Sequence, residues 1–245
     1  MNIFGLTDIG LVRKNNQDSY AIRVLSDDLA LAVVCDGMGG ARAGNVASAV
    51  AVETFAETLE EACKHGIPAG TEERQVLLSN ACQSANSHVF QLSVSNSEYQ
   101  GMGTTLVAAL ILPDEVYVAN IGDSRCYIWS DGTLKQITSD HSLVQALVDC
   151  GDITPEEART HPKKNLITRA LGIDEETRCD VFSFERHGGD SLLLCSDGLT
   201  NMVSDEKIAD EISLCASPEE TAKSLLLHAV EEGAPDNITV ILAQL

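Results

Sequence analysis

A series of short apolar runs joined by tight turns, between residues 104 and 138, most constrains how this chain can fold. The runs have strand length and are rich in β-branched and aromatic residues. They cover 104–112, 115–121, 125–130 and 134–138. Asp131-Gly132, which separates the last two, suits a tight hairpin turn. Strands joined by such short turns pair antiparallel, so we expect a meander.

Helical patterns are grouped in blocks between further strands. We expect strands at 3–9, 20–25, 29–35, 178–184, 191–196 and 238–244. Apolar residues recur at three- and four-residue steps over 46–63, which predicts a helix with one buried face. Other helices are expected at about 72–93 and as a pair across 204–232, and the polar stretch 141–172 is partly helical. Blocks of helices and strands predict an α+β class with helices covering sheet faces.

Length and composition predict one large domain over residues 1–245. With 245 residues and 44% hydrophobic residues, the chain can bury roughly 70 to 75% of its unfolded surface without disulfides or structural zinc. Its eight cysteines contain no CxxC pair, and several lie inside apolar runs. We therefore interpret them as reduced, mostly buried thiols of a cytoplasmic protein.

Charge and hydropathy limit the classes of partner that the protein can have. A net charge of −21 argues against nucleic acid, because a polyanion would be repelled. The amino terminus lacks the pattern of a secretory signal, and no apolar run reaches membrane-spanning length, so we expect no membrane insertion. Most acidic residues belong to solvated helical faces. The aspartates within apolar surroundings need another explanation.

Three of these apolar runs lead into an aspartate. The run 29–35 precedes Asp36, and those at 115–121 and 191–196 precede Asp123 and Asp197. Asp236 stands just before the last run. If the strands before Asp197 and after Asp236 pair antiparallel, both carboxylates reach one rim. Asp-Gly is also a common turn dipeptide, but Asp36 and Asp197 precede glycine-rich or helical segments rather than a return strand.

Carboxylates crowded in this way indicate bound cations. Their mutual repulsion raises their pKa values unless a cation neutralises them. Oxygen ligands alone favour Mg²⁺ or Mn²⁺ over zinc, which prefers histidine and cysteine. One aspartate shared by two cations would suit hydrolysis of phosphate esters by a bridging water.

Six short motifs resemble, in order, those of the metal-dependent protein phosphatases of type 2C, especially the compact bacterial members. They are RKNNQD at 13–18, DGMGG at 36–40, GTT at 103–105, GDSR at 122–125, SDGL at 196–199 and DN at 236–237. The resemblance spans nearly the whole chain. It implies a central sandwich of two antiparallel sheets flanked on both sides by α-helices, and hydrolysis of phosphoserine and phosphothreonine in proteins.

The resemblance also implies a ligand set for two Mn²⁺ or Mg²⁺ ions. Asp36 would bridge both ions, and the carbonyl of Gly37 would complete one coordination sphere. Asp197 and Asp236 would hold the other ion. Asp123, together with Asp197, resembles the pair that binds a third, weaker metal in bacterial relatives.

Other residues match supporting positions in the family. Arg13 corresponds to the arginine that holds the substrate phosphate, a role suited to its planar guanidinium. Asp18 would act through water behind the ligands, and Asn237 would orient Asp236 or a water. Arg125 is interpreted as a structural ion-pair partner. We expect Thr104 and Thr105, the two threonines of the GTT motif, to pack within a strand.

The segment 142–169 resembles the family's flap, which would contact protein substrates. Met38 stands where some members have a histidine that donates a proton, so the general acid would be a metal-bound water or a group not yet identified. Gln17 replaces a glutamate ligand of some relatives, which suggests more water around the second metal. His141 and His161 have suitable chemistry near neutral pH, but a loop histidine is usually solvated, so neither is assigned a catalytic role.

The expected partners are a serine/threonine kinase and its phosphorylated targets, and we expect a monomer. Two alternatives stay open. The first is a catalytically silent binding module on the same fold, which the presence of Asp36, Asp197, Asp236 and Arg13 disfavours. The second is a metal-dependent hydrolase of small phosphorylated metabolites, which the ligand set alone does not separate from a protein phosphatase.

Overall fold

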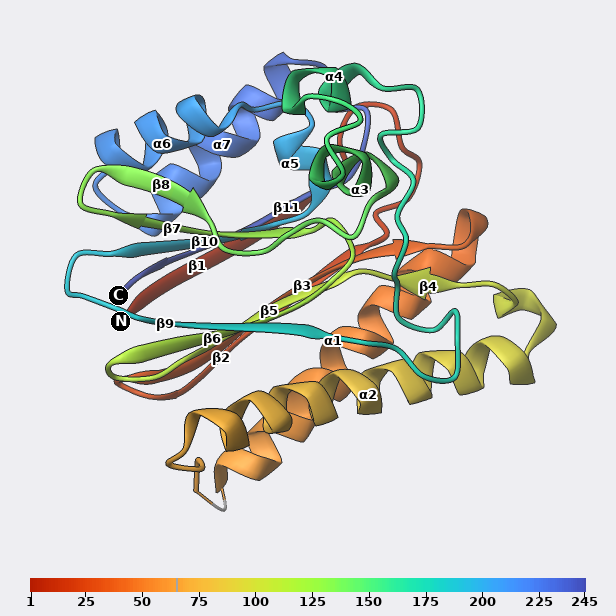
Figure 1. The fold of residues 1–245 in the computed structure, drawn as a ribbon, viewed down its shortest axis with the longest axis horizontal. Coiled ribbons are helices and arrows are strands. Elements are labelled where there is room, and N and C mark those ends of the chain that lie inside the picture. Colours follow the sequence, from red (N-terminus) through yellow and green to blue (C-terminus); the bar gives the residue numbers. More distant parts are fainter. Residues whose placement is uncertain (65) are drawn as a thin grey trace.

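A computed structural model describes residues 1–64 and 66–245, apart from the side chains of residues 41 and 42. Two antiparallel sheets dominate it (Figure 1). The first has the strand order β1 (Asn2–Asp8), β11 (Ile238–Gln244), β10 (Ser191–Cys195), β7 (Arg125–Ser130), β8 (Thr133–Gln136). The second has the order β2 (Asp18–Ser26), β3 (Leu29–Met38), β5 (Leu106–Ile111), β6 (Glu115–Ile121), β9 (Asp180–Glu185), with β4 (Gly103–Thr104) paired to β3.

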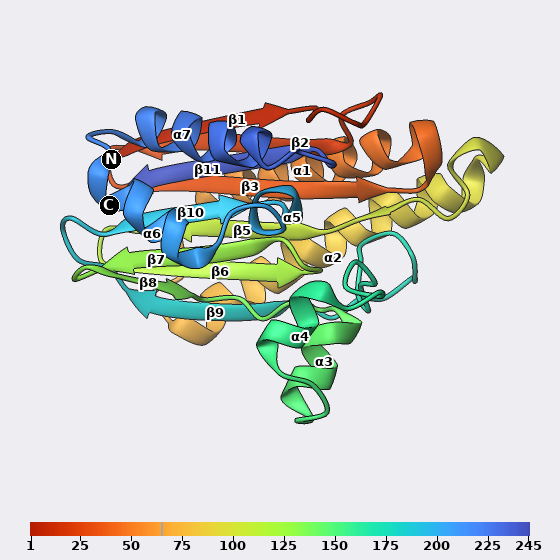
Figure 2. The ribbon, with the colours of Figure 1, turned by 90° about the horizontal axis from the view of Figure 1, so that it is seen from above.

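Helices cover the outer face of each sheet (Figures 1 and 2). The long helices α1 (Gly40–Lys64) and α2 (Thr71–Ser95) lie on the second sheet, whereas α6 (Asp205–Leu214) and α7 (Pro218–Glu231) lie on the first. The short helices α3 (Leu143–Asp149), α4 (Pro155–Thr160) and α5 (Asp197–Thr200), with the 3₁₀ turn η1 (Ser97–Tyr99), complete the elements of the described residues. The four layers confirm the expected α+β sandwich.

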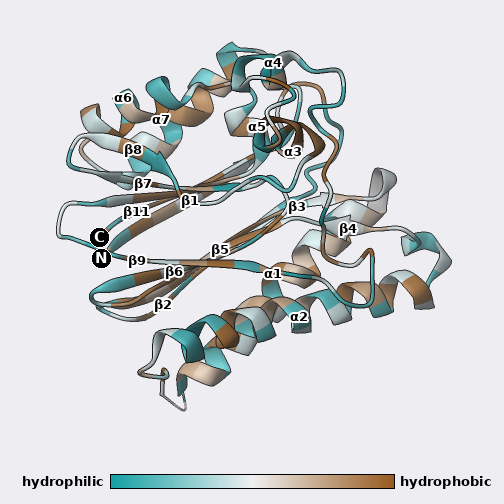
Figure 3. Ribbon diagram, in the orientation of Figure 1, coloured by the Kyte–Doolittle hydropathy of each residue, from teal (hydrophilic) through white to brown (hydrophobic). Residues whose placement is uncertain are grey.

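Strands buried on both faces explain the uninterrupted apolar runs. Alternate side chains of a strand point to opposite faces, and both faces of these strands are covered. In β3, Leu31 and Val33 belong to the core beneath α1 and α2, whereas Ala32 and Val34 belong to the core between the sheets. β5 and β11 alternate in the same way. Figure 3 shows the resulting concentration of hydrophobic residues along the strands of both sheets.

The element boundaries differ from the sequence expectation at β3 and α1. We expected a strand ending before Asp36, but β3 continues to Met38 because Gly37 and Met38 pair with β4. The following helix begins at Gly40 rather than near residue 46. Asp36 therefore lies inside a strand, and its neighbours in the sheet hold its backbone on both sides.

Strand pairing brings the aspartates to one end of the sandwich. β10 pairs antiparallel with β11, as expected, so Asp197, which begins α5 after β10, lies near the start of β11, which Asp236 precedes. In the other sheet, Asp18 is opposite Asp36 in the register of β2 and β3. The flap helices α3 and α4 lie at this same end, whereas both chain termini lie at the other (Figure 1).

Two further findings concern the cysteines and the helices. All eight cysteines are free thiols, and the Sγ atoms of Cys82 on α2 and Cys179 beside β9 are 3.1 Å apart. In the part of the chain that the structure describes, no helix is long and apolar enough to cross a membrane.

Gly198 permits the close approach of α5 to the strand that follows Asp236. A Cβ at this position would lie 1.9 Å from the carbonyl oxygen of Asn237. We expect Gly198→Ala to lower the free energy of unfolding by about 1–3 kcal/mol, because the backbone must shift to relieve the overlap. Urea denaturation measures the change. Gly188→Ala is the matched control, because a Cβ there meets nothing within 4 Å. Equal stability of the two variants would contradict this packing.

Candidate metal centre

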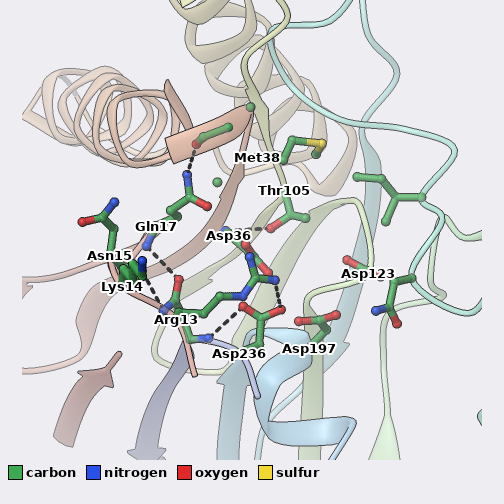
Figure 4. Close-up of a pocket in the computed structure, with 16 residues that line it drawn as sticks. Arg13, Lys14, Asn15, Gln17, Asp36, Met38, Thr105, Asp123, Asp197 and Asp236 are labelled. Atoms are coloured by element: carbon green, nitrogen blue, oxygen red, sulfur yellow. Dashed lines mark hydrogen bonds and ion pairs between the residues drawn. The ribbon is translucent and has the colours of Figure 1, made fainter. Parts of the chain in front are cut away.

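A cavity of about 530 Å³ opens at the end of the sandwich where the aspartates gather. Figure 4 shows Asp36, Asp123, Asp197 and Asp236 around it, with Arg13 reaching toward Asp236. The cavity is lined by residues of the loop after β1, of the ends of β3 and β10, and of the flap. These are Arg13, Lys14, Asn15, Gln17, Asp36, Gly37, Met38, Gly39, Gly40, Thr105, Asp123, Asn165, Ile167, Asp197, Asp236 and Asn237.

Thr104, the last residue of β4, and Thr105 clamp the backbone of Asp36. Its N–H donates to Thr105 Oγ1 at 2.9 Å, and its carbonyl accepts from Thr104 Oγ1 at 2.8 Å and from the Thr105 N–H at 2.9 Å. Our expectation of strand packing alone for these threonines was therefore incomplete. Burial, reinforced by the charge of Asp18, raises the pKa of Asp36 well above its usual range.

Asp18 lies behind Asp36, buried between the two sheets. Its Oδ2 accepts from the hydroxyls of Ser196 at 2.8 Å and Thr239 at 2.7 Å, which come from the opposite sheet. Its Oδ1 is buried without a hydrogen-bond partner. Burial raises the pKa of Asp18 to about 6, although the two hydroxyls oppose the shift.

Asp197 and Asp123 occupy the side of the cavity nearer the flap. Asp197 Oδ2 accepts from Asn201 Nδ2 at 2.9 Å across the short helix α5, whereas its Oδ1 is buried without a partner. Burial and the charge of Asp236 raise the pKa of Asp197. Burial and the charge of Asp197 raise the pKa of Asp123 to about 8. Both carboxyls would gain from a cation.

Arg13 and Asp236 form an ion pair at the mouth of the cavity. Arg13 Nη2 lies 2.6 Å from Asp236 Oδ2, and the arginine side chain is 49% exposed. We expected the Asn237 amide to orient Asp236 or a water, but it holds the loop that carries Arg13. Its Nδ2 donates to the carbonyls of Ile9 and Asn15, and its Oδ1 accepts from the Gln17 N–H. The side chain of Asn237 thus positions Arg13 more directly than Asp236.

Two other predicted residues have well-defined partners. Arg125 is a structural ion-pair residue, as expected, and its partner is Asp140, which it contacts through Nε at 2.9 Å and Nη2 at 2.8 Å. Gln17 Nε2 donates to the carbonyl of Gly40 at 2.7 Å. The amide that replaces a glutamate thus joins the loop of Arg13 to the start of α1.

The donor set fits divalent cations. The buried Oδ1 atoms of Asp18 and Asp197 have no hydrogen-bond partner, and burial and like charges raise the pKa values of Asp36 and Asp197, as expected where positive charge is needed. Among the residues that the structure describes, no three histidine, cysteine or carboxylate side chains are close enough to enclose an ion by themselves. Water and backbone carbonyls would therefore have to supply the other ligands, which is usual for Mg²⁺.

Sequence reasoning missed two kinds of contributor. Asn165 and Ile167 enter the cavity from the flap, and Lys14 and Asn15 from the loop after β1. Lys14 and Asn15 lie inside the 13–18 motif, so their position in the sequence could have indicated that they line the site. For the flap residues, no periodic pattern in the sequence indicated which side chains turn toward the carboxylates.

Comparison with known proteins places the chain in a family. A sequence model described as "Protein phosphatase 2C" matches residues 12–230. Serine/threonine phosphatase stp of Listeria welshimeri is 40% identical over 97% of this chain and 93% of its own length. The chain therefore belongs to the protein phosphatase 2C family.

Solved structures agree with this assignment. The Mycobacterium tuberculosis serine/threonine phosphatase PstP/Ppp superposes with a TM-score of 0.90 and 39% identity, covering 100% of this chain and 98% of that one. A structure of the PstP catalytic domain in complex with two manganese ions has a TM-score of 0.86 and 38% identity, with 99% and 97% of the two chains covered.

The raised carboxyl pKa values predict how stability depends on pH in chelator. The folded protein holds protons on Asp18 up to about pH 6 and on Asp123 up to about pH 8, whereas the unfolded chain releases them near 3.8. This contribution to stability is present below pH 3.8 and is lost as the pH rises through 6 and 8. We expect a lower Tm at high pH, and a larger increase on adding Mn²⁺ there.

Thermal unfolding in chelator and in Mn²⁺, at about pH 5 and pH 8, measures both effects. Asp123→Asn should reduce the difference in Tm between the two pH values. Asp131→Asn, in the exposed hairpin turn, should behave like the parent protein. Equal Tm values at the two pH values for the protein in chelator would contradict the repulsion described above.

Proposed function

We propose that this protein hydrolyses phosphoserine and phosphothreonine monoesters in proteins with the help of Mn²⁺ or Mg²⁺. The observation that carries the proposal is the convergence of four carboxylates and one arginine on a single cavity, where the buried Oδ1 of Asp197 lacks a hydrogen-bond partner. Membership of the protein phosphatase 2C family and the manganese complex of the PstP catalytic domain support it.

Asp36, Asp197 and Asp236, with the carbonyl of Gly37, would hold two cations, and Asp123 with Asp197 a third. When bound, the cations activate water and neutralise charge on the phosphoryl group. The threonine clamp fixes where Asp36 presents its carboxylate. Asp18 would act from behind the ligands, because its Oδ2 is already held by two hydroxyls while its Oδ1 lacks a protein partner.

Arg13 would hold the phosphate of the substrate. Its guanidinium is half exposed at the mouth of the cavity, where it contacts Asp236 through Nη2. A planar guanidinium can bind two phosphate oxygens at once and stabilise the negative charge that is spread over the transferring group. The Asn237 side chain donates two hydrogen bonds to the surrounding loop and accepts one from it, which keeps the Arg13 side chain at the mouth.

A second cavity supports protein rather than small-molecule substrates. It has a volume of about 380 Å³, shares Asp123 and Asp197 with the first cavity, and is lined on the flap side by residues that include Arg159 and Lys164. A phosphorylated side chain bound at Arg13 would therefore leave room for neighbouring residues of a peptide beside the flap. The positive charges of Arg159 and Lys164 would also offset the net charge of −21, which repels phosphopeptides at long range.

We propose that the protein acts in the cytoplasm as a monomer. It would reverse the action of a serine/threonine kinase on that kinase and its targets.

Release of phosphate from a phosphothreonine peptide tests the proposed activity. We expect turnover in Mn²⁺, none in chelator, and a fall of at least about 100-fold for Asp236→Asn, because even partners of metal ligands are worth 10 to 100-fold. Asp131→Asn is the matched control and should keep full activity. Hydrolysis of small phosphate esters without peptide turnover would favour a metabolite hydrolase, and binding without any turnover would favour the silent module.

Substitution of Arg13 separates phosphate binding from metal binding. We expect Arg13→Ala to lower kcat/KM by roughly 10²- to 10³-fold, the usual effect of removing one transition-state donor. Arg13→Lys should recover only part of this loss, because an ammonium lacks the planar fork. Arg186→Ala is the control, because Arg186 follows the other end of β9, where its Nε donates to the Pro113 carbonyl. Unchanged kcat/KM in Arg13→Ala would remove Arg13 from the site.

A further inference from the structure

His141 lies where the base of the flap meets the corner that carries Asp123. Its side chain is buried, with 6% exposed. The ring Nδ1 accepts a hydrogen bond from the Gly122 N–H at 3.0 Å, and the His141 N–H donates to the Gly122 carbonyl at 2.9 Å. Both peptide groups of the residue before Asp123 are thus fixed by one histidine.

The backbone of the same histidine helps to join the two ends of the flap. The two ends of the flap are joined by backbone hydrogen bonds, from Leu143 N–H to the Leu166 carbonyl at 2.8 Å and from Thr168 N–H to the His141 carbonyl at 2.7 Å. Ile167, which lines the carboxylate cavity, lies between these two bonds. The position of His141 therefore sets where the flap returns to the cavity.

The second ring nitrogen connects His141 to charged groups. Nε2 lies 3.2 Å from Asp180 Oδ2, at the start of β9, and 3.0 Å from Arg169 Nη1. Arg169 Nη1 donates to Asp180 Oδ1 at 2.8 Å. Since Nδ1 accepts from Gly122, a neutral ring carries its hydrogen on Nε2 and donates it to Asp180. Asp180 thus receives hydrogen bonds from both the histidine and the flap arginine.

A buried histidine with both nitrogens satisfied is often only a core residue. His141 differs because its two nitrogens serve two functional parts of the molecule. Nδ1 faces the corner of Asp123, which lines both cavities, and Nε2 donates to Asp180, which also accepts from Arg169 at the end of the flap. Burial lowers the pKa of His141, which favours the neutral ring that this arrangement needs.

We propose that His141 is a positioning residue that couples the flap to the Asp123 corner. Through Nδ1 it fixes the carboxylate of Asp123 relative to the other ligands, and through Nε2 and Asp180 it fixes the flap against the cavity. The inference rests on the proposed function, in which Asp123 binds a weak cation and the flap contacts the substrate.

Two substitutions of His141 separate its two arms. His141→Asn places an amide oxygen on Cγ, where Nδ1 was attached, so it can still accept from Gly122 but no longer reaches Asp180. His141→Gln places its amide near the former Nε2, so it can donate to Asp180 but loses the acceptor for Gly122. His161→Asn is the matched control, because His161 is a flap histidine whose Nδ1 accepts from the nearby Lys163 N–H.

The measurements are kcat and KM for a phosphothreonine peptide, Mn²⁺ binding by calorimetry without substrate, and hydrogen exchange of the flap amides. For His141→Asn we expect about a tenfold higher KM and faster flap exchange, with Mn²⁺ binding unchanged. For His141→Gln we expect about a tenfold weaker affinity at the weakest Mn²⁺ site and a lower kcat, with little change in KM. His161→Asn should match the parent protein.

If both variants show the same fall in kcat and the same rise in KM, with unaltered flap exchange and Mn²⁺ binding, His141 is only a core residue and the proposal is overturned. Parent-like behaviour of both would do the same. If a His141 variant fails to fold, Asp180→Ala tests the flap arm, since Asp180 is only partly buried, and it should reproduce the rise in KM and in flap exchange. A parent protein without phosphatase activity would refute the proposed function, while Mn²⁺ binding and exchange would still test His141.

Discussion

Electrostatic repulsion among buried carboxylates is the constraint on which the rest of the site depends. Antiparallel pairing sets Asp18 opposite Asp36, and the pairing of β10 with β11 brings Asp197 near Asp236. Asp18 and Asp36 cannot move apart without unpairing β2 from β3. Burial and the charges of neighbouring aspartates therefore raise the pKa values of Asp18, Asp36 and Asp197, and either protons or cations must neutralise these carboxylates.

The surrounding hydrogen bonds organise this charge. Threonine hydroxyls fix the backbone of Asp36, and hydroxyls from the opposite sheet hold one oxygen of Asp18. Asn237 fixes the loop of Arg13, and the guanidinium of Arg13, paired with Asp236, lies at the mouth. Neutral donors and acceptors thus set the geometry, whereas the carboxylates that they hold are left to bind cations. This division suits hydrolysis that depends on positioning and charge neutralisation.

Much of this arrangement could be predicted from the sequence, because strand pairing has simple consequences. Asp197 and Asp236 adjoin two strands that pair antiparallel, so their approach follows from the order of apolar runs. The roles of Thr105 and Asn237 could not be predicted in the same way. Each bonds to backbone groups distant in sequence, and such contacts leave no periodic signal. Likewise, the polar sequence around His141 indicates a solvated loop, yet tertiary contacts with Gly122 and Asp180 bury this residue.

The central claim is that the fold gathers these carboxylates to bind cations, and anomalous diffraction from crystals grown with Mn²⁺ tests it most directly. The account predicts manganese peaks within the cavity, with Asp36 between two ions and Asp197 and Asp236 beside one of them. Replacement of the Arg13–Asp236 contact by a cation at Asp236 would agree with this prediction. Manganese bound only elsewhere, with Asp36 and Asp197 contacting protein groups alone, would contradict the account.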